Sequence, residues 1–373
     1  MSRVLVVTND FPPRPGGIQT FVHELIRRLD PKGVVVYTSR WKGWEAFDAD
    51  QPFEVIREDT SVLLPSPKVS KRAVEVFRSR GCSSVLFGAA APLGLLAPKL
   101  RAAGAERLVA LTHGHEAGWA QLPGARHMLR RIGDGVDTVT YLGEYTRRRI
   151  AKALSPEAAG RMVQLTPGVD TDVFYPGAGD AIVRERYGLA DRPVIVCVSR
   201  LMPRKGQDTL IRVFPEVKGR VPDAALLIVG GGPYLKKLEK LGHESGHERD
   251  IIMTGSVPWP ELPAHYAAGD VFAMPCRTRR RGLDVEGLGI VYLEASATGL
   301  PVIAGDSGGA PDAVAAGKNG VVVADPQTLT AALCSYLNDP ELVRDTGLSG
   351  RGWVGSSWSW TRQVDGLNRL LDL

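Results

Sequence analysis

The chain has 373 residues, 44% hydrophobic and 23% charged, with a formal net charge of +5. This suits a soluble globular protein of two ordinary domains, and the mild positive charge favours an anionic ligand without by itself indicating nucleic acid. Its four cysteines are scattered and form no C-x-x-C pair, which argues for reduced cytosolic thiols and against a disulfide framework or a thiolate zinc site.

The first half of the chain alternates apolar runs with amphipathic segments. Residues 3–9 are typical of a central parallel strand, and a Pro/Gly loop then leads into a helix at Gly16 and Gly17. Further strands are expected at residues 34–39, 85–88, 107–112 and 138–142. This alternation predicts an α/β fold with a doubly wound sheet.

The same alternation restarts in the second half. Its expected strands are residues 193–201, 225–232, 250–255, 271–275 and 301–305, and the polar residues 171–192 are the expected linker. We therefore predict two Rossmann-like domains, 1–170 and 171–355, with a final helix at about 356–373 that packs back on the first. Ligands of such sheets bind beyond the carboxyl ends of the strands, which predicts a site between the two domains.

Two carboxylates mark the stretch 274–311. Glu286 lies in a glycine-flanked loop, and Glu294 stands about one turn into an expected helix at 290–298. The free N–H groups and the dipole of a helix N-terminus attract an anion, while carboxylates bind hydroxyl groups. A sugar nucleotide carries both phosphate and hydroxyl groups, so this stretch favours such a ligand.

A basic pair follows an earlier strand. Arg200 comes just after it, and Lys205 stands immediately before Gly206 and the next helix. A guanidinium and an ammonium together can neutralise a diphosphate and stabilise it as a leaving group. A solvated basic turn is the alternative, and the neighbouring strand ends favour phosphate. The nearby glycine turn at 229–233 fails the G-x-G-x-x-G spacing and no P-loop is present, which disfavours nicotinamide-dependent oxidoreductases and P-loop enzymes.

The histidines allow several interpretations. His113 and His115 end a first-half strand, where they are turn residues, sugar-hydroxyl ligands or metal ligands. His243 and His247 match H-E-x-x-H, the pattern of a zinc hydrolase. Glycines at 242 and 246 weaken any helix there, so we expect a solvated connection rather than a zinc site.

Two basic clusters remain. The first-half cluster has two interpretations of equal weight. Its residues are either on solvated helix faces, or they form an anionic-lipid surface or phospholipid headgroup site. The second-half run lacks interleaved aromatic residues and is expected to border the phosphate site. The apolar run at 85–98 is too short to span a bilayer, so any membrane contact is expected to be peripheral. The clusters are Arg126, Arg130, Arg131, Arg147, Arg148, Arg149 and Lys152, and Arg277, Arg279, Arg280 and Arg281.

Several motifs together resemble a known family. Two α/β lobes, the RxxxxK of SRLMPRKG, VGGGP and DVEGLGIVYLEA resemble the retaining GT-B glycosyltransferases. The segments NDFPPRPGGIQ, FGAAAPLGLLAP, THGHEAGW and GDSGGAP resemble the actinobacterial GDP-mannose-dependent phosphatidylinositol mannosyltransferases, most of all those that add the second mannose, to the monomannoside. The resemblance implies a first domain for the acceptor and a second for the donor.

The resemblance also implies roles for matching residues. Arg200 and Lys205 would hold the donor diphosphate, Glu286 the mannose hydroxyls and Glu294 the ribose. Gly17 would contact the phosphate, and His113 the sugar. The backbone of Gly287, Leu288, Gly289 and Ile290 would lie near sugar and phosphate, Ser256 and Val257 would meet the base, and Gly16, His115 and Asp284 are further candidates.

The implied reaction transfers mannose from GDP-mannose to an anionic phosphoinositide glycolipid with retention of configuration. It places the enzyme peripherally at the cytoplasmic face of the plasma membrane, without nucleic acid or a tightly bound cofactor, and leaves a requirement for Mg²⁺ unassigned. The alternatives are a related retaining transferase that uses UDP-N-acetylglucosamine, UDP-glucose or another acceptor, a zinc hydrolase at His243 and His247, and a non-enzymatic nucleotide-sugar sensor.

Overall fold

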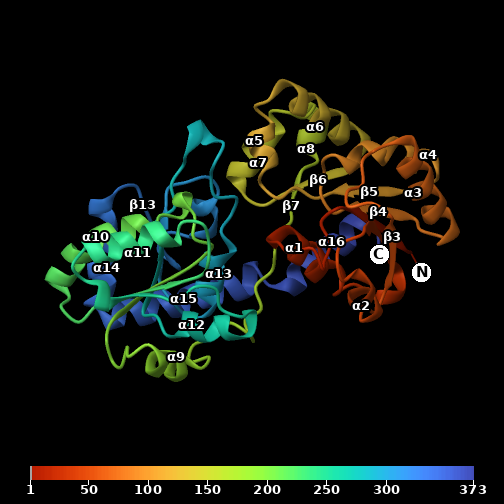
Figure 1. Cartoon of the computed structure of the whole chain (residues 1–373). Helices are drawn as coiled ribbons and strands as arrows, with labels where there is room; N and C mark the ends of the chain where they lie inside the picture. Colours follow the sequence, from red (N-terminus) through yellow and green to blue (C-terminus); the bar gives the residue numbers. More distant parts are fainter. Residues whose placement is uncertain (1) are drawn as a thin grey trace. The chain divides into compact units, whose positions relative to one another are not determined.

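The computed structural model describes residues 2–373, except for the side chain of Arg281. The chain forms two compact units (Figure 1). The first runs from the N-terminus to Pro167 and also contains Trp360–Leu373, and the second is Gly168–Ser359. Of the helices in the described part of the chain, none is long and apolar enough to cross a bilayer.

The first unit is built on a seven-stranded sheet of order β3-β2-β1-β4-β5-β6-β7, whose neighbouring strands are parallel. Both faces of its central strand are buried, since Val4 and Val6 belong to one core cluster and Leu5 and Val7 to another. This explains the continuous apolar run in the sequence. The strands are β1 (Val4–Thr8), β2 (Val34–Ser39), β3 (Glu54–Glu58), β4 (Ser84–Phe87), β5 (Arg107–Ala110), β6 (Thr138–Tyr141) and β7 (Val163–Gln164).

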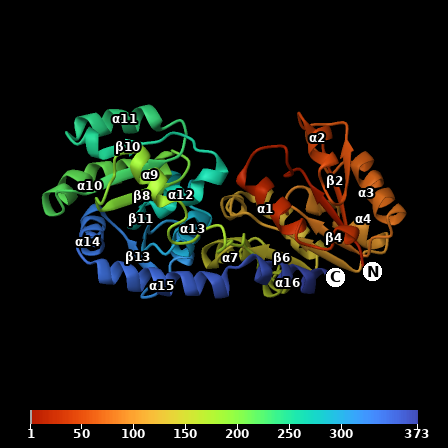
Figure 2. The ribbon, with the colours of Figure 1, turned by 90° about the horizontal axis from the view of Figure 1, so that it is seen from below.

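The helices of the first unit connect these strands, and α16 joins them from the C-terminal end of the chain. Helix α16 packs on β4 and β5 and lies near β4 in Figure 2, and its residues Val364, Leu367 and Leu371 belong to the core cluster of Val4. The helices are α1 (Gly17–Ile26), α2 (Trp44–Ala49), α3 (Pro67–Ser79), α4 (Ala97–Ala102), α5 (Glu116–Trp119), α6 (Pro123–Gly135), α7 (Glu144–Ala151), α8 (Pro156–Gly160) and α16 (Trp360–Leu371).

The second unit has a six-stranded parallel sheet of order β10-β9-β8-β11-β12-β13. Its strand order reverses between β8 and β11, which makes their carboxyl ends the topological switch point of a Rossmann-like sheet. The strands are β8 (Val194–Val198), β9 (Ala225–Val229), β10 (Ile251–Met253), β11 (Val271–Met274), β12 (Val302–Gly305) and β13 (Gly320–Val323).

The helices of this unit are α9 (Asp180–Arg186), α10 (Gln207–Arg220), α11 (Leu235–Glu244), α12 (Leu262–Ala267), α13 (Ile290–Ala297), α14 (Pro326–Leu337) and α15 (Pro340–Ser357). The prediction of two doubly wound α/β domains is confirmed. Residues 171–192, the expected linker, instead lie within the second unit and contain α9, whose buried Val183 ties it to that unit. Polar composition alone did not reveal that packing.

Candidate functional site

Four of the predicted residues lie at the switch point of the second unit. Arg200 follows β8, and Lys205 ends the short helix Pro203–Lys205 before α10. Glu286 lies in the loop after β11, and Glu294 is on α13. Because β8 and β11 are parallel neighbours, their following loops leave the sheet at the same edge. We call Arg200, Lys205, Glu286, residues 287–290 and Glu294 the switch-point site.

Glycines bring these loops into backbone contact. Gly206 has a φ of 80°, and a Cβ there would lie 2.0 Å from the carbonyl oxygen of Pro275. Gly305, at the end of β12, would place a Cβ 2.0 Å from the carbonyl oxygen of Cys276. Residues with a side chain cannot occupy such positions without displacing the backbone. The loops after β8 and β11 are therefore held against one another before any ligand arrives.

Lys205 and Glu286 bind each other. The Lys205 ammonium donates to Oε2 of Glu286 at 2.6 Å, and the two residues are only 9% and 7% exposed. Arg200 is exposed, and no hydrogen bond or ion pair of its guanidinium is described. The two predicted phosphate ligands thus differ, since one is already neutralised by a carboxylate and the other faces solvent. An incoming diphosphate has to share or replace the carboxylate on Lys205.

The helix end beside this pair is open to an anion. Gly289 is the N-cap of α13 with a φ of 81°, and no side chain caps the first turn. The carbonyl oxygen of Glu286 accepts from the N–H of Gly309 at 2.8 Å, which fixes the loop before the helix. Gly287, Leu288, Gly289 and Ile290 therefore lead into a helix whose first N–H groups have no side-chain acceptor, an arrangement that favours phosphate.

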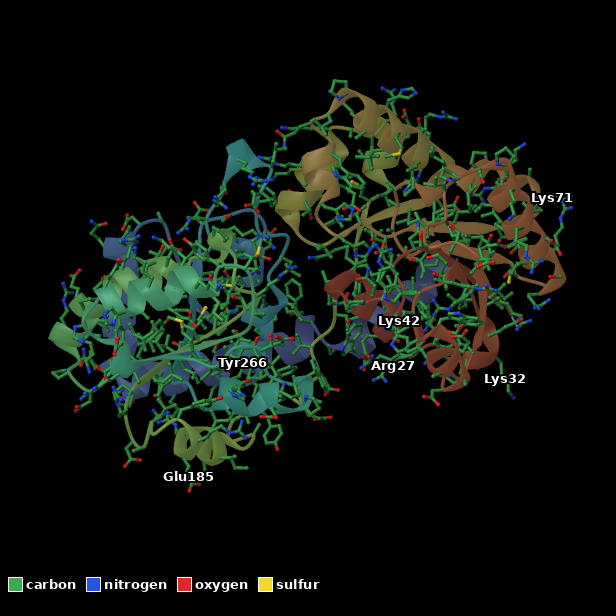
Figure 3. All side chains as sticks on the ribbon, in the orientation of Figure 1. Arg27, Lys32, Lys42, Lys71, Glu185 and Tyr266 are labelled. Atoms are coloured by element: carbon green, nitrogen blue, oxygen red, sulfur yellow. The ribbon has the colours of Figure 1, made fainter. Side chains whose placement is uncertain are left out.

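Glu294 is the acid on α13, and Tyr266 on α12 holds it. The Tyr266 hydroxyl donates to Oε2 of Glu294 at 2.7 Å, and Figure 3 labels Tyr266 among the side chains of the second unit. Burial raises the pKa of Glu294 to about 7, while the tyrosine hydrogen bond opposes that rise. The residue keeps some solvent exposure, and no described hydrogen bond occupies Oε1. That oxygen is available to accept from a ligand hydroxyl.

The residues predicted to meet the base, Ser256 and Val257, follow β10, near the glycine turn that follows β9. Gly230 and Gly232 lie against the backbone of residues 199–201, where added Cβ atoms would meet carbonyl oxygens at 2.1 and 2.3 Å. A Cβ on Gly231 would lie 2.2 Å from Oγ of Ser256. Ser256 is exposed and Val257 partly so. The structure therefore places Ser256 next to the glycine turn, which itself contacts the segment after β8.

The basic run after β11 is partly paired with acids. Arg277 donates to Asp208 at 2.9 Å, and Asp284 lies 3.4 Å from Arg279 and 3.6 Å from Arg204. Asp284 thus acts as a counter-charge within its own loop. Arg280 is exposed, and the side chain of Arg281 lies outside the described residues. An arginine that is paired with a carboxylate can bind a ligand only after the ligand displaces that carboxylate. Arg200 is therefore the better-placed free cation.

In the first unit, the loop after β5 carries His113 and His115. His113 shares a hydrogen bond of 2.6 Å between its Nε2 and the carbonyl oxygen of Gly88, and burial lowers its pKa. The fully buried Glu116 accepts from the His113 N–H at 3.0 Å, and its other oxygen lies 3.4 Å from Nε2 of the exposed His115. Glu116 was not predicted, because a glutamate beside a histidine in a turn gives no sign of burial.

The loop after β1 holds the predicted glycines. Gly16, the N-cap of α1, packs so closely that a Cβ would lie 2.2 Å from Oε1 of Gln19. Gln19 in turn donates to Asp10 at 2.6 Å. A Cβ on Gly17 would meet nothing within 4 Å, so its backbone is open to a ligand. The structure brings Gly16, Gln19 and Asp10 together and leaves Gly17 free.

The two histidines of the H-E-x-x-H match do not share a helix. His243 and Glu244 end α11, whereas Gly246 has a φ of 74° and His247 lies beyond the helix. His243 is exposed and pairs with Glu248. Within the part of the chain that the structure describes, no group of three or more His, Cys, Asp or Glu residues is arranged to hold a metal ion. The helix runs further than expected, but its end separates the two histidines.

Comparison with known proteins identifies the family of this chain. The family model "Glycosyltransferase Family 4" matches residues 15–173, and "Glycosyl transferases group 1" matches residues 181–353. The GDP-mannose-dependent alpha-(1-6)-phosphatidylinositol monomannoside mannosyltransferase of Mycolicibacterium smegmatis is 52% identical over 99% of this chain and 98% of its own. The chain belongs to this mannosyltransferase family. A second member, the GDP-mannose-dependent monoacylated alpha-(1-6)-phosphatidylinositol monomannoside mannosyltransferase of Corynebacterium glutamicum, is 44% identical over 99% and 97% of the two chains.

Solved structures show the fold that this mannosyltransferase family shares with more distant proteins. Anabaena Alr3699/HepE, crystallised with UDP, superimposes with a TM-score of 0.82 at 17% identity, covering 99% of each chain. Sucrose-phosphate synthase of Thermosynechococcus elongatus gives 0.75 at 22% identity, covering 99% and 98%. These likenesses, with the two Rossmann-like sheets, confirm the predicted GT-B fold.

Proposed function

We propose that this protein transfers mannose from GDP-mannose to a phosphatidylinositol monomannoside with retention of configuration. The donor and acceptor are supported by the full-length likeness to mannosyltransferases whose names carry both. The observation that carries the chemistry is the switch-point site, where Lys205, Glu286 and an uncapped helix end converge. Cations and free N–H groups suit a diphosphate, and carboxylates suit the hydroxyls of the sugars.

The donor roles follow from this arrangement. Arg200 and Lys205 bind the diphosphate, and the N–H groups at the start of α13 add a third contact. Glu286 accepts from mannose hydroxyls, and Oε1 of Glu294 accepts from the ribose while Tyr266 holds Oε2. Ser256 and Val257 meet the base. His113 and Gly17 belong to the first unit and act on the sugar and the phosphate from there.

The reaction needs no covalent enzyme intermediate. Lys205 donates a hydrogen bond to Oε2 of Glu286, which lowers the nucleophilicity of this carboxylate. We infer same-face attack, in which an acceptor hydroxyl oxygen bonds to the anomeric carbon while the bond to the diphosphate breaks. The departing diphosphate takes the hydroxyl proton, and Arg200 and Lys205 stabilise the negative charge that develops on it.

The acceptor determines where the enzyme works. A glycolipid acceptor lies in a membrane, so we propose peripheral contact with the cytoplasmic face of the plasma membrane. Residues 1–170 with the C-terminal helix form the acceptor domain in this proposal, and residues 171–355 form the donor domain.

The test is a transfer assay in detergent with labelled GDP-mannose and purified phosphatidylinositol monomannoside, followed by separation of the lipids. We expect a labelled dimannoside whose new anomeric configuration matches that of the donor. Label in the lipid from UDP-glucose or UDP-N-acetylglucosamine, and none from GDP-mannose, would contradict the proposed donor. Binding of GDP-mannose without any product would indicate a sensor instead of an enzyme.

A further inference from the structure

A basic cavity lies in the first unit, apart from the strand-end loops described above. It has a volume of about 380 Å³ and is bounded by α6 and by the connection between α7 and α8, which group together in Figure 1. Arg126, His127 and Arg130 line it from α6, and Ala153 and Leu154 line it from the connection. One side of the cavity is therefore cationic and another is apolar.

The cations of this cavity lack partners. Arg126 and Arg130 are exposed, and in the described part of the chain no hydrogen bond or ion pair of either guanidinium is found. On neighbouring α7, by contrast, Arg147 and Arg148 both donate to Glu144, at 2.7 and 2.9 Å. The cluster that the sequence presents as one basic region is thus two different surfaces. The arginines of α7 are satisfied by their own helix, and those of α6 are not.

The position of the α6 arginines is also electrostatically unfavourable without a ligand. Arg126 and Arg130 stand four residues apart on one helix face, where like charges repel. The first turn of α6 contains no acidic residue to offset them. An anion bound between the two side chains would remove this repulsion, and a phosphate matches the geometry of two guanidinium groups.

We propose that this cavity binds the phosphate of an anionic phospholipid headgroup at the membrane surface. The apolar wall of Ala153 and Leu154 and the exposed Leu122, 51% accessible just before α6, favour a lipid over a free phosphate ion. This deepens the peripheral contact proposed above, and it rests on that proposal only in taking a membrane as the site of action. The lipid bound here is a component of the surface, separate from the mannose acceptor.

Vesicle binding tests the site. The full chain is mixed with phosphatidylcholine vesicles with or without phosphatidylglycerol, and bound protein is separated by flotation. Arg126→Gln/Arg130→Gln should weaken binding to the anionic vesicles by about fivefold per cation, on the order of twentyfold for the pair. Wild-type binding should fall as salt is raised and be weak on phosphatidylcholine alone.

A matched variant separates this site from general surface charge. Lys68→Gln/Lys71→Gln removes two exposed cations from α3 of the same unit, and Figure 3 shows Lys71 at the outer edge of that unit. We expect this pair to change vesicle binding by less than about threefold. An equal or larger loss in the α3 variant, or wild-type binding by the α6 variant, would overturn the proposal. Unchanged thermal unfolding of both variants checks their folding.

A competition experiment with inorganic phosphate distinguishes a lipid headgroup from a soluble phosphate. It should compete with anionic vesicles only weakly, because it makes no contact with the apolar wall. Tight binding of inorganic phosphate, abolished in Arg126→Gln/Arg130→Gln and accompanied by no vesicle binding, would assign the cavity to a soluble phosphate and overturn the lipid proposal. These mixtures contain neither donor nor acceptor, so their failure leaves the transfer assay in detergent as an independent test of the proposed function.

Discussion

The strand ends of the two sheets are built differently. In the second unit, glycines lock the loops into backbone contact, and charges neutralise one another in pairs such as Lys205 with Glu286 and Arg277 with Asp208. In the first unit, the loop after β5 buries a single carboxylate, Glu116, whose Oε1 is within 3.4 Å of His115 but accepts no described hydrogen bond. Lys205 and Glu286 are thus paired with each other before ligand binding, whereas Glu116 keeps an oxygen that is only partly satisfied.

This difference changes what a ligand must do at each place. At the switch-point site, the proposed diphosphate would compete with an existing ion pair, so its binding would exchange one anion for another on Lys205. A buried pair is also costly to break from one side, because the remaining charge stays desolvated. The predictions below separate the binding role of each residue from its role in holding the fold.

The largest effect is expected from Lys205→Ala. Losing a preorganised cation at the leaving group should lower turnover by about 10²- to 10³-fold. It should also destabilise the fold by up to about 3–5 kcal/mol, because Glu286 is left buried without its partner. The double variant Lys205→Ala/Glu286→Gln should recover much of that stability in thermal unfolding and none of the turnover.

Lys236→Ala, which removes an exposed lysine from α11, is the control and should change neither quantity. A folded Lys205→Ala protein with wild-type turnover would exclude the assigned role of Lys205.

Glu286→Gln should move binding and catalysis in opposite directions. Removing the carboxylate from Lys205 leaves the ammonium free for a diphosphate, so GDP should bind roughly tenfold more tightly. Turnover should nevertheless fall by about 10²-fold, because a charged contact to mannose is lost. Calorimetric titration with GDP and a steady-state assay give the two values. Weaker GDP binding would show that the ion pair does not compete with the donor.

Glu294 should give pH effects of opposite sign on stability and on donor binding. Burial raises its pKa from 4.5 to about 7, so the folded protein holds this proton more tightly than the unfolded chain. The residue's contribution to stability therefore falls as pH rises from about 4.5 to about 7. Donor binding should improve over the upper part of that range, by about fivefold from pH 6 to pH 7, because the ionised carboxylate is the better acceptor for ribose.

Glu294→Gln should flatten both profiles, as measured by donor titration and thermal unfolding across this pH range. Tyr266→Phe should move both profiles to higher pH, because it removes the hydrogen bond that favours the ionised form of Glu294. An unchanged pH profile of donor binding in Glu294→Gln would separate this residue from the ribose.

The smallest effect concerns the first unit. Burial lowers the pKa of His113, and the charge of Glu116 is the largest influence that raises it. Glu116→Gln keeps an oxygen that can accept from the His113 N–H but removes the charge, so the pKa of His113 should fall further. NMR titration of the imidazole measures this change, with exposed Glu106→Gln as the control. An unchanged His113 pKa would contradict this influence of Glu116.

The sequence predicted the strands buried on both faces and also the edge strand β10, but it missed the other edge strands, β3, β7 and β13. Continuous apolar runs revealed β1, β8 and β12, because both of their faces pack against helices. Strand β3 has the sequence EVIRE and is only half-buried, so it lacks that pattern. Strand β13, at an edge of the other sheet, has two exposed residues between two buried ones and is too short for a clear period. Edge strands depend on a neighbour that local sequence does not reveal.

The same limit applies to the candidate site, because local sequence does not reveal which loops are neighbours. Motif spacing placed Arg200, Lys205, Glu286 and Glu294 after strands, but it did not show that Lys205 and Glu286 meet across 81 residues. That contact depends on β8 lying next to β11, which is a property of the sheet order. Tyr266 was missed as the partner of Glu294 for a similar reason, since the two are 28 residues apart on different helices.

The most direct test is a crystal structure of the full chain with GDP-mannose. The account predicts the diphosphate within hydrogen-bond distance of Arg200 and Lys205, the mannose against Glu286, and the ribose on Oε1 of Glu294. A nucleotide bound elsewhere, with the Lys205–Glu286 pair intact and Arg200 directed into solvent, would contradict it.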